Sequence, residues 1–146
     1  MRIVGAVTQG SGPINEDGFG SIERDGAVAA AWVFDGVTGI NGRNILGGGT
    51  DAAWLVAKAG ARIAELAGRD LPLQDILDLL VEGLCADRRA AGVGAPPDYD
   101  PPAACLVLVK RYGDGWKALR LGDSCLLARM ADGTMKTALP ESAFDH

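Results

Sequence analysis

A chain of 146 residues is long enough for one domain that buries roughly 68–70 % of its unfolded surface. Hydrophobic residues make up 48 % and charged residues 23 % of the sequence, which is typical of a soluble globular protein. The net charge of -5 and the scattered basic residues argue against a nucleic-acid-binding protein, because phosphate backbones require clustered Lys and Arg.

The N-terminal third of the chain predicts strands and one hairpin. Arg2–Thr8 is strand-like and ends at glycine and proline residues. The apolar segments Gly18–Glu23 and Ala27–Phe34 flank Arg24-Asp25-Gly26, and Asp-Gly between apolar runs is a strong hairpin signal. We therefore expect an antiparallel ribbon that turns at Asp25-Gly26.

This hairpin brings two acidic residues together at its open end. Asp17 precedes Asp25 by eight residues, and Asp35 follows Gly26 by nine residues. Directly paired positions in an antiparallel ribbon have Cβ atoms about 4.5–5.5 Å apart. The spacing therefore predicts two carboxylates close enough to share a metal cluster.

Two helices are predicted in the middle of the chain. Thr50 or Asp51 is a suitable N-cap for the first helix, and Gly68 is a suitable C-terminal stop. The second helix is expected from Leu73 to about Ala91, because leucine and isoleucine recur there at helical spacing.

The C-terminal third predicts three more strands separated by glycine-containing turns: Ala103–Tyr112, Trp116–Leu121 and Cys125–Met130. Hairpin connections imply an antiparallel sheet, and the helices must pack against it. The order of elements therefore predicts an α+β architecture rather than a doubly wound sheet.

The cysteines and the histidine limit the possible chemistry. Cys85, Cys105 and Cys125 are odd in number and lack metal-ligand spacing, which indicates three small buried thiols in a reducing cytoplasm. The one histidine is His146, so a Ser-His-Asp triad or a histidine metal cluster cannot readily form. No segment has the roughly 20 apolar residues of a membrane span, and none is typical of a secretory signal.

Three aspartates instead stand at turns beside strand-like runs: Asp17, Asp35 and Asp123. A carboxylate at a strand end is reachable by solvent and rigidly held, which suits hard cations such as magnesium or manganese. A turn is the alternative reading for each of them, because Asp and Gly are favoured in turns anyway. Other aspartates beside glycine are interpreted as hairpin turns: Asp25, Asp114 and Asp132.

At these aspartates the sequence resembles the metal-dependent protein phosphatases of type 2C. The segment Asn15-Glu16-Asp17 matches the family's early Asn-x-Asp motif, and Trp32–Gly39 matches its strand that ends in Asp-Gly. Leu119–Ser124 matches its strand that ends in Gly-Asp-Ser. The three motifs stand in the family's order and span nearly the whole chain.

The resemblance implies a set of metal ligands and a fold. Asp35 would bridge two Mg2+ or Mn2+ ions, and the backbone carbonyl of Gly36 would bind one of them. Glu16 and Asp17 would act nearby, through water or at the edge of the cluster, and Asp123 with Asp17 would hold a third, weaker ion. The implied fold is α+β, with antiparallel sheets in a β-sandwich core flanked by helices.

The implied activity is that of a metal-dependent Ser/Thr phosphoprotein phosphatase. Its substrate would be a phosphorylated protein, hydrolysed by a metal-activated water without a protein nucleophile, with Asp35 and Asp17 as the catalytic residues. We expect a cytoplasmic signalling enzyme that binds neither nucleic acid nor membrane, whereas the oligomeric state stays open.

Departures from the family pattern leave a second function open. The stretch Ser11–Ile14 contains no arginine, although in the family an arginine at the corresponding position often binds the phosphate. No residue after Asp123 matches the family's later Asp-Gly and Asp-Asn segments, so residues 1–146 are expected to form a single, incomplete phosphatase 2C-like domain. The alternative is a degenerate or truncated phosphatase-like module that binds a partner or a phosphorylated segment without turnover.

Overall fold

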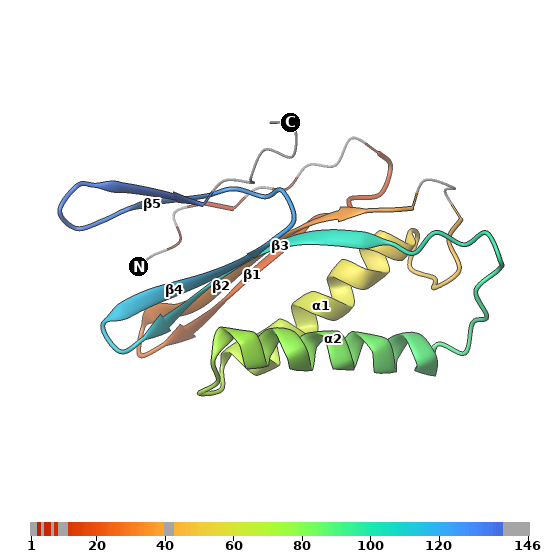
Figure 1. Cartoon of the computed structure of the whole chain (residues 1–146), viewed down its shortest axis with the longest axis horizontal. Helices are drawn as coiled ribbons and strands as arrows, with labels where there is room; N and C mark the ends of the chain where they lie inside the picture. The colour runs from red at the N-terminus through yellow and green to blue at the C-terminus, as the bar shows by residue number, and fades with distance from the viewer. Residues whose placement is uncertain (1–2, 4, 7, 9–11, 40–42, 139–146) are drawn as a thin grey trace, which may run out of the picture.

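Four antiparallel strands form the main sheet of the protein, in the order β1-β2-β3-β4 (Figure 1). The computed structural model describes residues 3, 5–6, 8, 12–39 and 43–138. The strands of this sheet are β1 (Gly18–Arg24), β2 (Ala27–Val37), β3 (Ala103–Tyr112) and β4 (Gly115–Leu121). The α+β architecture of antiparallel sheets flanked by helices is thereby confirmed.

The hairpin between β1 and β2 turns at Asp25 and Gly26, as predicted. Their φ angles are 55° and 71°, the left-handed conformation that a two-residue turn of type I′ requires at both positions. The pairing shifts between Ile22 and Glu23, where a β-bulge places the extra residue on β2. This bulge accounts for the unequal arm lengths of the hairpin.

Strand β2 is longer than the sequence pattern predicted. Asp35 and Gly36 continue the strand, because β3 pairs with β2 from Ala30 to Val37 and Asp35 faces Cys105. The apolar run ends at Phe34, but backbone pairing with the neighbouring strand holds the next three residues extended to Val37. Asp35 is thus fixed within the sheet rather than in the loop that follows.

Two helices cover one face of the sheet: α1 (Asp51–Ala67) and α2 (Leu73–Ala90) (Figure 1). Thr50 is the N-cap of α1, and its hydroxyl accepts a hydrogen bond from the Ala53 N–H at 3.1 Å. Gly68 is the C-cap residue, as expected. Within the described ranges, neither helix combines the length and the apolarity needed to cross a bilayer.

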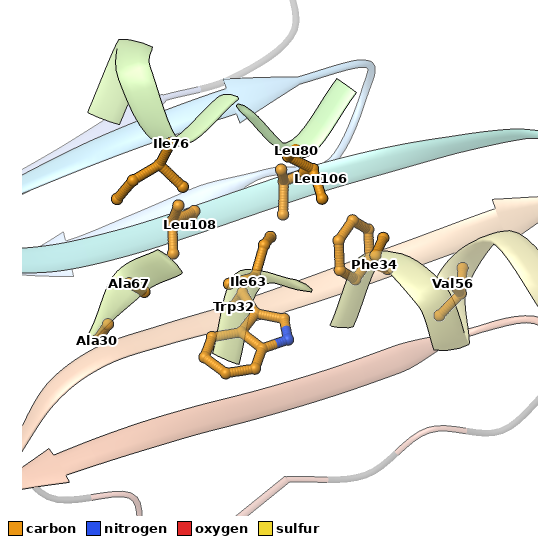
Figure 2. Packing of buried hydrophobic residues seen from close by; sticks show 11 residues of the cluster. Ala30, Trp32, Phe34, Val56, Ile63, Ala67, Ile76, Leu80, Leu106 and Leu108 are labelled. Carbon is orange, nitrogen blue, oxygen red and sulfur yellow. The ribbon is translucent and has the colours of Figure 1, made fainter. Parts of the chain in front are cut away.

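The hydrophobic core lies between the sheet and the two helices. Alternate residues of β2 point toward the helices, and Trp32 and Phe34 are each only 6 % exposed. Figure 2 shows their side chains facing Ile63 of α1, and Ile76 of α2 beside Leu108 of β3. Burial of this apolar surface stabilises the layered arrangement.

The C-terminal part of the described chain forms a separate antiparallel ribbon of β5 (Leu126–Arg129) and β6 (Met135–Ala138). Strand β5 lies within the predicted Cys125–Met130, whereas β6 was not predicted. The Asp132 carboxylate accepts hydrogen bonds from the backbone and the hydroxyl of Thr134, which confirms Asp132 as a turn residue.

The predicted strand Arg2–Thr8 falls partly outside the described residues. Its described members, Ile3, Gly5, Ala6 and Thr8, are not part of any strand. His146 likewise lies outside the described residues.

Candidate metal centre

Asp17 and Asp35 lie at neighbouring register positions at one end of the sheet. Gly18 pairs with Phe34, so the next residues beyond that pair are Asp17, just before β1, and Asp35 in β2. Phe34 points into the core, and the alternation along β2 therefore directs the exposed Asp35 to the opposite face. The hairpin register thus puts both residues at the same end of the sheet.

Asp123 reaches the same end of the sheet from β4. The thiol of Cys105 donates a hydrogen bond to Oδ1 of Asp123, and the Sγ–Oδ1 distance is 3.0 Å. Cys105 is also the cross-strand partner of Asp35 in the pairing of β2 with β3. Cys105 therefore stands between two of the aspartates that the sequence singled out.

Gly122 allows this close approach. Its φ of 77° is left-handed, and a Cβ at this position would lie 2.3 Å from the Cys105 Sγ. Glycine is the residue that tolerates both conditions. The turn after β4 consequently passes close to Cys105 and brings Asp123 to the thiol.

The electrostatics of Asp123 follow from these contacts. The hydrogen bond from Cys105 is the main cause that lowers the pKa of Asp123, and the nearby Arg120 guanidinium acts in the same direction. The same bond raises the pKa of the Cys105 thiol, and burial adds to that effect. Near neutral pH the pair is therefore a carboxylate that accepts a hydrogen bond from a neutral thiol.

The carboxylates of Asp17 and Asp35 differ from Asp123 in their contacts. In the described part of the chain, no hydrogen bond or ion pair engages either side chain. The backbone N–H of Asp17 donates to Oδ1 of Asn15 at 3.0 Å, so Asn15 orients the main chain at this residue. Among the described residues, no side chain competes with a cation for either carboxylate.

Glu16 is placed differently from the aspartates. Its carboxylate accepts hydrogen bonds from the Thr38 N–H at 3.1 Å and from the Thr38 hydroxyl. Burial alone would raise the pKa of Glu16, but hydrogen bonds from Thr38 and Thr50 outweigh it and lower the pKa. Glu16 thus ties the start of β1 to the end of β2 and to the N-cap of α1.

Gly36 is held by the backbone of the same segment. It pairs with Ala104 on β3, and a Cβ at this position would lie 2.3 Å from the Glu16 carbonyl oxygen. The absence of a side chain at Gly36 is therefore required by the close passage of the chain at Glu16.

A cavity of about 400 Å³ opens beside the aspartates. Asp17, Asp35 and Ser124 contribute to its wall, so residues from three separate sequence motifs meet at one opening. Its remaining lining residues are Gly5, Ala6, Thr8, Gly18, Phe19, Val33 and Phe34. A second cavity of about 440 Å³ lies beside α1, and Asp17 contributes to it as well.

The donor atoms in this region suit a hard divalent cation. Carboxylate oxygens and a backbone carbonyl are the ligands that magnesium and manganese prefer. Among the residues that the structure describes, however, no three side chains of His, Cys, Asp or Glu are grouped as a metal cluster. The residues therefore fit the predicted ions in chemistry, while the described side chains do not form a closed ligand cage.

Sequence reasoning was wrong about the burial of the cysteines and did not single out Cys105, which contacts Asp123. Cys85 and Cys125 are exposed, and Cys105 is partly exposed, rather than three buried thiols. Leu106, Val107 and Leu108 are all buried, so burial along β3 does not alternate in a way that singles out Cys105. Its position beside Asp35 depends on strand pairing that a single sequence does not specify.

Comparison with known proteins gives one family and one similar solved structure. The family model described as Protein phosphatase 2C matches residues 4–145. The crystal structure of the Mycobacterium tuberculosis serine/threonine phosphatase PstP/Ppp matches with a TM-score of 0.57 and 22 % sequence identity. The match covers 94 % of this chain and 53 % of that one, so the chain spans about half the length of the matched structure. No curated protein matches the sequence.

Proposed function

Since this chain belongs to the protein phosphatase 2C family, we propose that it functions as a metal-dependent Ser/Thr phosphoprotein phosphatase. The observation that carries the proposal is the register of the sheet. It places Asp17 and Asp35 at neighbouring positions and ties Asp123 to the cross-strand partner of Asp35. We treat residues 1–146 as one unit, because a single family model matches almost all of them.

Each aspartate has a proposed role. Asp35 would bridge two divalent cations, magnesium or manganese, and the Gly36 carbonyl would bind one of them. Asp17 would hold the cluster from β1, and Asp123 with Asp17 would bind a third, weaker ion. When bound, such cations neutralise the phosphate and activate a water for in-line attack.

The contacts of Glu16 support a positioning role. Its carboxylate is occupied by Thr38, so it braces the loop after β2 while its own carbonyl lies against Gly36. This brace would keep the Gly36 carbonyl and the Asp35 carboxylate in a fixed relation.

A phosphorylated protein is the proposed substrate class. A phosphomonoester dianion is repelled by an acidic chain, and the formal net charge here is -5. Bound cations would reverse this repulsion locally. The proposed setting is cytoplasmic signalling, with no nucleic-acid or membrane partner.

The direct test is hydrolysis of p-nitrophenyl phosphate and of a phosphopeptide with and without Mn2+. We expect Mn2+-stimulated activity that Asp35→Ala abolishes, because Asp35 is the proposed bridging ligand. Asp114→Ala is the matched control, since Asp114 lies at the opposite end of the sheet, in the turn between β3 and β4. Activity that is unchanged in Asp35→Ala would contradict the assignment of Asp35 as a metal ligand.

A second candidate is a binding module without turnover. It is favoured by the lack of a three-residue metal cluster among the described side chains. In that case a phosphopeptide would bind without being hydrolysed, and the chain would bind Mn2+ weakly because too few carboxylates compensate the cation charge. Calorimetric titration with Mn2+ and phosphopeptide, followed by a phosphate-release assay, separates the two functions.

A further inference from the structure

We infer that Cys105 is a positioning residue of this site, whose thiol holds the Asp123 carboxylate in place at the end of the sheet where Asp35 lies. The Cys105 Sγ lies 3.0 Å from Oδ1 of Asp123. On the other side, Cys105 faces Asp35 directly across the pairing of β2 with β3. The inference rests on the proposed metal site, because it assigns Cys105 a task toward that site.

The fold gives Cys105 this position through strand alternation. Leu106 points into the core and is 2 % exposed, so Cys105 lies on the opposite face together with Asp35. The left-handed Gly122 then lets the chain turn close to the thiol, because any Cβ there would collide with Sγ. The strand pairing and the turn at Gly122 therefore both permit the contact between Cys105 and Asp123.

The hydrogen bond orients one specific oxygen. A thiol is normally a weak donor, but a bond to an ionised carboxylate is stronger than a bond between neutral groups. With Oδ1 engaged, rotation of the Asp123 carboxylate is restrained, and Oδ2 would be the oxygen offered to a cation. Asp123 is exposed on the turn after β4, and this bond restrains its side chain.

The other cysteines do not share this geometry. Cys85 is an exposed residue of α2. Cys125 is exposed, and its Sγ is 3.8 Å from the Asp123 carbonyl oxygen rather than from the carboxylate. Cys85 therefore serves as a matched control for removal of a thiol elsewhere in the chain.

The test is titration of the whole chain with Mn2+, and separately with Co2+, in the wild type and in three variants. Cys105→Ala removes the donor, Cys105→Ser keeps a donor, and Cys85→Ala removes a thiol outside the site. We expect Cys105→Ala to weaken Mn2+ binding about 10-fold to 100-fold, as is usual when a group that orients a metal ligand is lost. We expect Cys105→Ser to restore most of the affinity and Cys85→Ala to leave it unchanged.

Two outcomes would overturn the role of Cys105 alone. The first is Mn2+ affinity that Asp35→Ala abolishes and Cys105→Ala leaves intact. The second is a thiolate-to-cobalt charge-transfer band that disappears in Cys105→Ala, because the sulfur would then be a ligand rather than a positioning group. Affinity that is unaffected by Asp35→Ala would instead overturn the proposed metal site, and the inference with it. Urea unfolding of each variant shows whether it is folded during the titration.

Discussion

At Gly36, the hydrogen that replaces a side chain leaves room for the Glu16 carbonyl. A Cβ on Gly36 would lie 2.3 Å from that oxygen and 3.0 Å from Cγ2 of Val56. Neither neighbour can give way easily, because one belongs to the backbone and the other to the core. The segment before β1 and the end of β2 are therefore packed directly against each other at the site.

Gly36→Ala should lower the free energy of unfolding by about 1–3 kcal/mol, the usual cost of overpacking. The φ of Gly36 is not left-handed, so the loss would come from the collision rather than from backbone strain. Urea unfolding followed by circular dichroism measures the change. Gly94→Ala is the control, because a Cβ at Gly94 would meet no atom within 4 Å. Equal stability of the two variants would contradict the packing described for Gly36.

At the scale of elements, a polar network fixes α1 against the loops around it. Asp51, the first residue of α1, is 1 % exposed and accepts hydrogen bonds from Ile45 N–H, Leu46 N–H and the Tyr99 hydroxyl. The Oδ2 of Asp51 lies 2.7 Å from that hydroxyl. The loop before α1 and the loop before β3 are thus tied to one buried carboxylate.

Because of this network, the stability of the fold should fall at alkaline pH. Burial, followed by the hydrogen bond to Asp51, raises the pKa of Tyr99 from 10.0 to about 12. The neutral phenol is therefore favoured in the folded state, so its contribution to stability is complete below pH 10.0 and is lost as the pH rises through about 12.

Tyr99→Phe should lower stability at neutral pH by about 1.5–3 kcal/mol, the range for a hydrogen bond to a charged group. Between pH 10.0 and about 12, the variant should also lose less stability than the wild type. Urea unfolding across this range, with tyrosinate absorbance recorded in parallel, tests both effects. If the variant loses as much stability at alkaline pH as the wild type, the loss comes from other groups. One such group is Tyr112, because burial also raises its pKa.

At the scale of the whole molecule, the two faces of the main sheet differ. Helices α1 and α2 cover one face (Figure 1), whereas the other exposes the cross-strand pair Phe19 and Val33 at 51 % and 48 %. Val37, on the same face, is 58 % exposed. Exposed apolar side chains of this kind favour association or the binding of apolar probes.

Replacing Phe19 and Val33 together with threonine should reduce the fluorescence of a bound apolar dye such as ANS and reduce self-association in sedimentation. Threonine keeps a high strand propensity, so the sheet itself should persist. Val81→Thr on α2 is the control, because Val81 is 52 % exposed but lies outside this face. Dye binding that falls equally in both variants would argue against a distinct apolar surface on the sheet.

Local signals in the sequence were sufficient for most elements. The hairpin at Asp25-Gly26, the N-cap at Thr50 and the strand Ala103–Tyr112 were all predicted, because each depends on neighbouring residues. Strand β6 was not predicted, since its four residues carry too short an alternation to be distinguished from a loop.

The sequence by itself determined which residues could carry metal chemistry, through the Asn-x-Asp, Asp-Gly and Gly-Asp-Ser motifs that the resemblance used. Only the tertiary structure decided how they meet. Pairing with β3 placed Asp35 opposite Cys105, and the thiol in turn bound Asp123. Pairing also extended β2 beyond its apolar run, and folding brought the Glu16 carboxylate into hydrogen bonds with Thr38. These outcomes depend on strand register and on contacts between residues far apart in the chain, and local composition does not encode either of them.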